Sequence, residues 1–292
     1  MPEHNKKLLL VDGMAAVYRA FFAIPDMRTA DGRPNNAIFG FIRMLNQLVK
    51  AWAPTHLAVI FDGGLPEERM ELVPEYKANR TPMPDDLRSQ LDGINEYLEA
   101  AAVDAVRLDS CEADDVMATL AVRAGSDGAD TVFLATHDKD LFQLVNESVS
   151  IVPVAGKREA MGVAEIVAKT GVQPGQIVDW LALIGDSADN IKGVRGVGPK
   201  TATGLLCEYG DIDAIMAHLD DLPRAKLRES LNDSRELIER NRKMVKLYTD
   251  LDGVPDWKLF ERKVPSVGRL LEFYDRFEFD SFARPLREPE LF

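Results

Sequence analysis

The stretch KLLLVDG, residues 7–13, decides the fold. It is a short apolar run that ends in Asp-Gly, and HLAVIFDGG at 56–64 repeats the pattern. Short apolar runs bounded by polar residues or glycine are typical of buried strands. Two further runs, at 131–135 and 149–153, predict a third and a fourth strand.

Helical patterns separate these runs. Apolar residues recur with a 3.6-residue period over 36–51, and 86–101 and 113–124 are similar. Strands that alternate with helices predict an α/β fold, with a mostly parallel central sheet flanked by helices. Ligands of such sheets bind at the carboxyl ends of the strands. Asp12, Asp62 and Asp138 come just past such ends, so we expect them to meet in space.

The pattern changes along the chain. Beyond 172 the strand signals vanish and helical patterns dominate through Tyr248, with a last helix at about 267–277. We therefore expect an α/β core over 1–172 and a mostly helical region over 173–292. Inside the core, 63–84 is polar, holds four prolines and is long for a connection. Such a segment is typical of a functional loop or lid.

Acidic residues gather at the expected strand ends, in turns and at one helix start. There are nine of them: Asp12, Asp62, Glu112, Asp114, Asp115, Asp138, Asp140, Asp186 and Asp189. If they converge, their mutual repulsion makes physical sense only around hard cations such as Mg²⁺. The sequence therefore predicts a metal site.

Each group of acids also has a simpler interpretation. Asp-Gly is a common turn pair, so Asp12 or Asp62 alone could be a turn residue. In SCEADD, first-turn acids could interact with the helix dipole, with Ser110 or Asp109 as the cap. The interaction of an acid with the helix dipole contributes ~0.3–1 kcal/mol, which does not clearly offset the repulsion among three acids.

The last two pairs are defined by their spacing. Asp138 and Asp140 are two residues apart and face the same side of an extended loop. Asp186 and Asp189 are three apart, and one helical turn would place them together. Either pair alone is a weak signal, and both together with SCEADD are a strong one.

The string GVRGVGPKTATGLL at 193–206 predicts a tight turn that leads into a helix. Its glycines let the backbone approach a phosphate, and the helix start offers unpaired N–H donors. Lys200 and Thr201 add side-chain donors. The alternative is a plain helix–turn–helix corner. No GK[ST] closes the string, so a nucleotide-hydrolase loop is not expected.

The composition narrows the class of protein. The 292 residues carry a net charge of −13, which taken alone argues against nucleic-acid binding, although 190–207 holds three bases and no acid. Two cysteines and four scattered histidines match no zinc spacing. No apolar run approaches the roughly 20 residues of a membrane span, and the amino end is unlike a signal peptide. We expect a cytoplasmic protein with no membrane partner.

Six motifs together resemble the bacterial 5′ nuclease family, which includes the 5′–3′ exonuclease domain of DNA polymerase I and stand-alone flap endonucleases. The motifs are VDGxxxxYRAF (11–21), IFDGG (60–64), PEYKANR (74–80), CEADD (111–115), DKDLFQLV (138–145) and LALIGDSADNIKGVRGVGPKTA (181–202). They cover nearly the whole chain in order. The resemblance implies a PIN-like core, a helical arch within 63–95 and a helix–three-turn–helix element at about 178–210.

The resemblance also implies roles for residues. The nine acids would bind two or three Mg²⁺ or Mn²⁺ ions: Asp12, Asp62, Glu112 and Asp114 on one side, and the other five on the opposite side. Lys77 and Arg80 would contact the scissile phosphate, and Arg19 would lie near it. Tyr76 would belong to the arch that admits a single-stranded 5′ end. DNA-binding residues of the helix–three-turn–helix, which would hold K⁺, would be Lys192, Arg195, Gly196, Gly198, Lys200 and Thr201.

The expected activity is metal-dependent cleavage at 5′ flaps and 5′ ends of DNA, in replication and repair such as primer removal. Substrates would carry a 5′ flap, overhang or nick, and an RNA–DNA hybrid is a further candidate. The enzyme is expected to be a monomer. Rivals are a non-catalytic DNA-binding protein, an aspartyl phosphatase and a metal-dependent RNase. A free-standing nuclease and an excised polymerase domain both stay open, as does the role of His137, a departure from the family's usual glycine.

Overall fold

The computed structural model describes residues 5–155 and 159–288. Its centre is a five-stranded sheet in which all neighbouring strands are parallel. The strands are, in spatial order, β3 (Asp104–Arg107), β2 (His56–Phe61), β1 (Lys7–Asp12), β4 (Thr131–Ala135) and β5 (Val149–Val152). The predicted α/β fold with a parallel sheet is confirmed.

The register aligns the carboxyl ends of the three central strands. Val11 of β1 pairs with Val59 of β2 on one side and with Ala135 of β4 on the other. The strand order runs outward in both directions from β1, so the sheet has a topological switch point between β1 and β4. A crevice forms beyond the strand ends at such a point.

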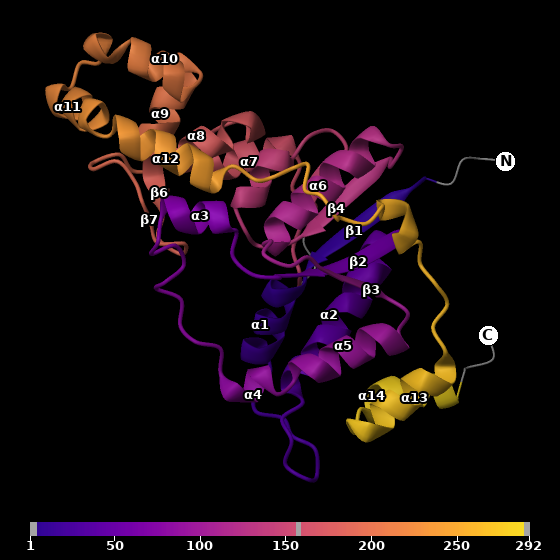
Figure 1. Ribbon diagram of the computed structural model, residues 1–292. Coiled ribbons are helices and arrows are strands. Elements are labelled where there is room, and N and C mark those ends of the chain that lie inside the picture. Colours follow the sequence, from indigo (N-terminus) through magenta and orange to yellow (C-terminus); the bar gives the residue numbers. More distant parts are fainter. Residues whose placement is uncertain (1–4, 156–158, 289–292) are drawn as a thin grey trace.

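Helices cover both faces of the sheet (Figure 1). Leu9 and Val11 of β1 point to a cluster that includes α1 (Gly13–Ala23), α2 (Asn36–Trp52), α5 (Leu91–Ala100), α13 (Val267–Arg276) and α14 (Asp280–Arg287). Leu8 and Leu10 point to the other cluster, with α6 (Ala113–Ser126), α7 (Val163–Thr170) and α8 (Ile177–Ile184). This alternation is what a strand buried on both faces requires.

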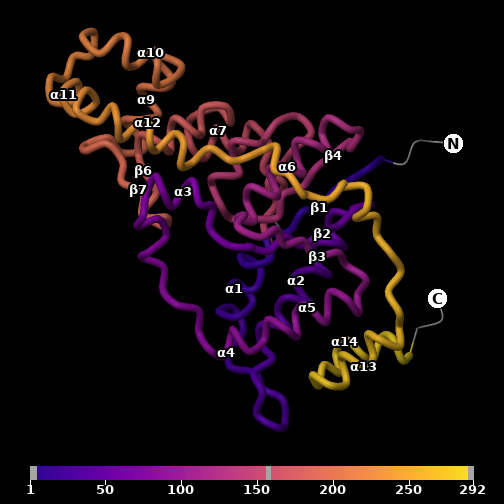
Figure 2. The backbone as a smooth tube through the Cα atoms, in the orientation of Figure 1, coloured from indigo at the N-terminus to yellow at the C-terminus, as the bar shows by residue number. Residues whose placement is uncertain are grey.

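The second half is mostly helical, as expected. It continues with α9 (Pro199–Tyr209), α10 (Ile212–Ala217), α11 (Ala225–Asp233) and α12 (Arg235–Val245). Short 3₁₀ helices lie at η1 (Asp140–Leu144), η2 (Pro174–Gln176), η3 (Leu219–Asp221) and η4 (Trp257–Phe260). In Figure 2 the chain leaves α9–α11 at one end, returns along α12 past α3 and α6, and ends in α13 and α14 on the far side.

Three local predictions are wrong. Strand β3 was not expected, because only Val106 of its four residues is buried and DAVR has no apolar run. The helix expected at 86–101 is α4 (Asp85–Arg88) and α5, separated at Gln90. The buried Gln90 side chain turns inward, where its Oε1 accepts the N–H of Ala37 at 2.8 Å.

The third wrong prediction concerns the acids at 186 and 189. They lie on a short antiparallel hairpin rather than a helical turn, formed by β6 (Gly185–Asp186) and β7 (Ile191–Lys192) in a region expected to lack strands. Gly185 and Gly193 allow this hairpin. A Cβ on Gly193 would lie 2.2 Å from the carbonyl oxygen of Ile184.

The long connection 63–84 holds one short helix, α3 (Glu67–Leu72). Turns follow at 74–79, and an irregular stretch then leads to α4. Figure 1 shows α3 close to α12 and to the β6–β7 hairpin, and the chain then runs down one side of the molecule to α4. Among the described residues, no helix is long and apolar enough to cross a membrane.

Candidate metal site

Two carboxylates are fixed where strands end. Asp12 closes β1 and caps α1, because its Oδ1 accepts the N–H of Ala15 at 2.9 Å. Its Oδ2 accepts the hydroxyl of Thr136, which follows β4, at 3.1 Å. Asp62 follows β2, and its Oδ1 accepts the N–H of Ala113 at 2.9 Å. Both side chains are therefore oriented by backbone or hydroxyl donors at the carboxyl edge of the sheet.

Gly63 brings the helix α6 to this edge. A Cβ at this position would lie 1.8 Å from the carbonyl oxygen of Leu108, so only glycine permits the approach. The Gly63 N–H donates to the backbone carbonyl of Cys111 at 2.9 Å. Glu112 is the N-cap residue of α6, not Ser110 or Asp109 as considered above, and Asp62 supplies the capping oxygen. Asp114 and Asp115 thus begin a helix anchored directly on β2.

Asp138 and Asp140 come from the turn after β4. The N–H of Asp138 donates to the Thr136 hydroxyl at 3.1 Å, and the N–H of Asp140 donates to Asp138 Oδ1 at 2.9 Å. Thr136 therefore joins Asp12 and Asp138, although its own role was not expected from the sequence. Asp140 begins η1 and is buried.

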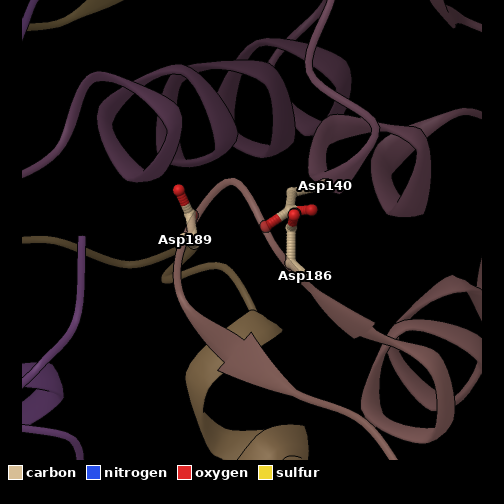
Figure 3. Close-up of side chains that lie close together, drawn as sticks. All are labelled: Asp140, Asp186 and Asp189. Atoms are coloured by element: carbon tan, nitrogen blue, oxygen red, sulfur yellow. The ribbon is translucent and has the colours of Figure 1, made fainter. Parts of the chain in front are cut away.

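Asp186 ends β6 and Asp189 lies in the turn 187–190, and together they complete the site. Together with Asp140 they offer carboxylate oxygens that all lie within 4.8 Å of one another. Figure 3 shows the three side chains, which come from η1 and from the hairpin. Asp186 and Asp189 are each 6% exposed. Asp140 Oδ1 is buried and has no hydrogen-bond partner among the described residues.

The electrostatics show that the acids form one cluster. Burial and then repulsion from Asp62 and Asp138 raise the pKa of Asp12 to about 6. Burial, then the charges of Asp138 and Asp12, raises the pKa of Asp114 well above its usual range. Burial and the charges of Asp138 and Asp186 do the same to the pKa of Asp140. Buried like charges raise one another's pKa in this way, and a bound divalent cation would offset the repulsion.

A hard divalent cation fits this cluster. Mg²⁺, Mn²⁺ and Ca²⁺ take oxygen ligands, and carboxylates are their preferred charged ones. The buried, unpartnered Oδ1 of Asp140 is an available ligand atom beside Asp186 and Asp189. The group of Asp140, Asp186 and Asp189 contains no cysteine or histidine. Softer metals, which prefer sulfur or nitrogen ligands, are therefore not favoured.

Cations of the 63–95 segment dock on the same acids. Lys77 Nζ pairs with Glu112 and lies 3.6 Å from Asp189. Arg80 Nη2 donates to Asp189 Oδ1 at 2.9 Å, and the Tyr76 hydroxyl donates to Glu112 Oε2 at 3.1 Å. Burial opposes the charge of Lys77, but Glu112 and Asp189 outweigh it and raise its pKa.

The backbone at Lys77 is also unusual. Its φ of 57° lies in the left-handed region, which costs a non-glycine residue about 1 kcal/mol or more. Its N–H donates to the Asp189 carbonyl at 3.2 Å. These contacts hold the turn 74–80 against the acidic cluster.

Other residues expected at the site lie further along the surface. Arg19 is exposed on α1 and lines a hollow of about 450 Å³ together with Tyr18, Phe22 and His137. The six residues expected to bind DNA lie on β7, in the turn after it and at the start of α9: Lys192, Arg195, Gly196, Gly198, Lys200 and Thr201. All but Thr201, which is partly buried, are exposed, and Gly196 has a φ of 78°.

One buried residue of the site was missed. Arg69 of α3 is 2% exposed and pairs with both Glu112 and Asp115. Its only signal in the sequence is a single base among the acids of EERMEL. Lys139, whose Nζ lies 3.2 Å from Asp186, was missed as well.

Comparison with known proteins matches the chain to two family models. Residues 7–171 match "5′-3′ exonuclease, N-terminal resolvase-like domain", and residues 172–267 match "5′-3′ exonuclease, C-terminal SAM fold". A 5′-3′ exonuclease of Aquifex aeolicus is 38% identical over 283 residues, which cover 96% of this chain and 94% of that one. DNA polymerase I of Rhizobium leguminosarum is 36% identical over 96% of this chain, but over only 28% of its own length.

A solved structure shares the fold. The flap endonuclease of bacteriophage T5, in a pseudo-enzyme–product complex with DNA and metal ions, superposes with a TM-score of 0.68. The match covers 97% of this chain and 98% of that one, at 24% sequence identity.

Proposed function

The chain belongs to the 5′-3′ exonuclease family, and from this we propose that it is a divalent-metal-dependent 5′ nuclease. It would hydrolyse phosphodiester bonds at 5′ flaps and 5′ ends of DNA. One observation carries the proposal: Lys77 and Arg80 lie on the same carboxylates that form the candidate metal site. A phosphate ester is a substrate group that protein cations and metal ions held by acids would stabilise together.

Two or three Mg²⁺ or Mn²⁺ ions would be held by the cluster. Asp140, Asp186 and Asp189 would hold one ion, as their oxygens are close enough to share it. Five of the remaining six acids would hold the others: Asp12, Asp62, Glu112, Asp114 and Asp138. When bound, the ions would polarise the phosphate and lower the pKa of the attacking water.

The protein's own cations would bind and orient the scissile phosphate. Lys77 and Arg80 now neutralise Glu112 and Asp189. Divalent ions would take over that neutralisation and leave both side chains free for phosphate oxygens. Tyr76 would keep Glu112 in place through its hydroxyl. Arg19, at the far end of the cluster on α1, would contact a phosphate next to the scissile one.

The turn after β7 would hold the duplex. Lys192, Arg195, Lys200 and Thr201 carry donors that suit phosphate oxygens, and Gly196 and Gly198 let the backbone approach closely. A K⁺ ion would be bound at this turn by backbone carbonyls. Recognition through the backbone implies selection by DNA structure rather than sequence.

The cellular role follows from such a substrate. DNA with a 5′ flap, overhang or nick arises in replication and repair, and an RNA–DNA hybrid arises at a primer end. A DNA substrate implies action in the cytoplasm of a bacterial cell. One copy of the chain already brings Lys77 and Arg80 onto the acids, and the proposed active form is a monomer.

A flap assay tests the proposal. The protein is incubated with a 5′-labelled flap, a matching blunt duplex and a single strand, with Mg²⁺ and then with excess chelator. Short labelled products from the flap, abolished by chelator and by Asp186→Asn but not by Asp127→Asn, would support it. Asp127 is a matched control because it is an exposed aspartate paired with Lys258. Equal cleavage in chelator, or no cleavage of any 5′ end, would rule it out.

A further inference from the structure

Arg69 lies at the junction of three parts of the chain. Its Nη1 and Nη2 donate to the two oxygens of Asp115 at 2.6 and 2.8 Å, and Nη1 also pairs with Glu112. Its Nη2 donates to the carbonyl of Lys246 at 3.1 Å. The guanidinium carbon lies 5.0 Å from the centre of the Tyr248 ring. Arg69 therefore ties α3 to the start of α6 and to the segment after α12.

Asp115 is fully engaged in this junction. One oxygen accepts from Arg69 Nη1, and the other accepts from Arg69 Nη2 and from the Tyr248 N–H at 2.9 Å. The residue is 0% exposed. A planar guanidinium that binds both oxygens of a buried carboxylate forms a strong bidentate ion pair and neutralises its charge. Both oxygens of Asp115 are thus bound by protein donors.

Asp114 and Asp115 face different neighbours. The acids whose charges raise the pKa of Asp114 are Asp138, Asp12 and Asp140, all in the acidic cluster. The charge of Lys77 opposes them. The charges that act on Asp115 are those of Arg69 and Glu112. Successive residues of a helix point about 100° apart, so two adjacent acids need not share a site.

The contacts of Glu112 connect Arg69 to Lys77. Glu112 Oε2 is held by Arg69 and by the Tyr76 hydroxyl at 3.1 Å. Glu112 Oε1 pairs with Lys77. Because the carboxylate is planar and 2% exposed, fixing one oxygen fixes the direction of the other. The position of Lys77 thus depends on Arg69 through Glu112.

We propose that Arg69 is a positioning residue that aims Glu112 and Lys77, and that Asp115 is its counterion rather than a metal ligand. Arg69 does not reach the substrate. It sets where Lys77 stands when the phosphate arrives. The kinetic prediction rests on the proposed nuclease activity. The calorimetry and the hydrogen-exchange measurement below do not.

Metal binding tests the role of Asp115. Mn²⁺ is titrated calorimetrically into the DNA-free protein, its Asp115→Asn variant and its Asp114→Asn variant. Asp114→Asn should weaken Mn²⁺ binding about 10–100-fold, and Asp115→Asn by less than about threefold. Equal weakening in both variants would overturn the assignment of Asp115 as a counterion.

Hydrogen exchange tests the link to Lys77 without turnover. The Lys77 N–H donates to the Asp189 carbonyl, so its exchange reports how firmly the turn is docked. Arg69→Lys keeps the positive charge but loses the bidentate guanidinium. The Lys77 N–H should then exchange about tenfold faster or more. The control is Arg123→Lys, at the other end of α6, where the arginine donates to the carbonyls of Leu251 and Val254. An unchanged rate at Lys77 in Arg69→Lys would contradict the proposal.

A double-mutant cycle tests the kinetic consequence. Arg69→Lys should lower the single-turnover rate on a 5′ flap about 10–100-fold while flap affinity changes less than about twofold. In a Lys77→Met background the same substitution should cost less than about twofold, because both act through one group. Equal losses in the two backgrounds would mean that Arg69 acts otherwise. If the wild-type protein cuts no flap, the proposed function fails, and the calorimetry and exchange results still decide the roles of Asp115 and Arg69.

Discussion

At the residue scale, Asp140 combines the features expected of a carboxylate that binds a cation. It is buried, one oxygen has no partner among the described residues, and its pKa is raised well above the usual range by burial and the charges of Asp138 and Asp186. A buried, repelled carboxylate destabilises the protein unless an ion is bound. Function and stability therefore make opposite demands on this side chain.

Replacing Asp140 should separate these demands. Asp140→Asn removes a metal ligand, so cleavage should fall at least about 10²–10³-fold. The same change removes a repelled charge, so the metal-free protein should melt about 2–4 °C higher. Flap cleavage and thermal melting in chelator measure the two effects, with Asp127→Asn as the control. A lower melting temperature would mean that Asp140 is not repelled in the folded protein.

The stability of the metal-free protein should depend on pH through Asp12. Its folded pKa of about 6 exceeds the usual 3.8, so protonated Asp12 favours the folded state. That contribution is complete below about pH 3.8 and is lost as the pH rises through 6. Between pH 5 and 7.5 in chelator, the wild-type protein should lose about 1–2 kcal/mol more of its unfolding free energy than Asp12→Asn does. Urea unfolding measures this, and equal losses would show that Asp12 is not shifted.

The sequence identified the acids but not all of their surroundings. The nine carboxylates could be proposed as a site because strand ends and repeated acids leave a local pattern. Arg69 and Thr136 leave none, since one is a lone base among acids and the other an ordinary residue after a strand. Their roles depend on contacts between segments 46 and 124 residues apart, which no local pattern reveals.

At the element scale, the turn 74–80 and the β6–β7 hairpin form a paired unit. Asn190 donates to the Glu75 carbonyl at 2.8 Å, and Asn79 donates to the Ser187 carbonyl at 2.8 Å. With Lys77 and Arg80 on Asp189, these contacts hold a loop over the metal site. The hairpin itself was predicted as a helical turn, because a three-residue spacing fits both structures and the glycines that decide between them act only at close range.

Lys77→Ala should slow cleavage much more than it weakens binding. Lys77 sits inside the acidic cluster, where it can reach a phosphate at the metal ions but not the duplex beyond. The single-turnover rate should fall about 10²–10³-fold, while duplex affinity stays within about twofold. Quench-flow kinetics and fluorescence anisotropy on one flap substrate provide both numbers. Equal losses in rate and affinity would make Lys77 a general DNA contact.

Lys200→Ala should have the opposite signature. Lys200 is exposed at the start of α9, next to the turn proposed to bind the duplex. Its loss should weaken duplex binding and reduce the salt slope of log affinity by about 1, with a single-turnover rate at saturating DNA near that of the wild type. The control is Lys263→Ala, whose lysine pairs with Asp104 on the opposite part of the molecule. An unchanged salt slope would place Lys200 outside the DNA interface.

At the scale of the whole molecule, the parallel sheet is what makes the site possible. Strands β1, β2 and β4 end side by side, so acids more than one hundred residues apart reach one crevice. The hairpin β6–β7 then joins that crevice directly to the turn that precedes α9 (Figure 1). A duplex held at the turn would therefore have one end beside the acids.

The parts of the fold that follow from local sequence patterns could be predicted. Strand periodicity and helix periodicity predicted the sheet and the position of its ligand edge. They could not predict β3, whose strand character comes from pairing with β2 rather than from its own residues. They could not predict that α13 packs against α5 either, because that contact joins segments far apart in the sequence.

The central claim is that the carboxylate cluster holds divalent ions. Anomalous scattering from crystals of the protein soaked in Mn²⁺ tests it most directly. The account predicts a peak between Asp140, Asp186 and Asp189, about 2.0–2.4 Å from their oxygens, a second near Asp12 and Asp114, and Lys77 and Arg80 moved off Glu112 and Asp189. No peak at the cluster, with both side chains still on these acids, would contradict it.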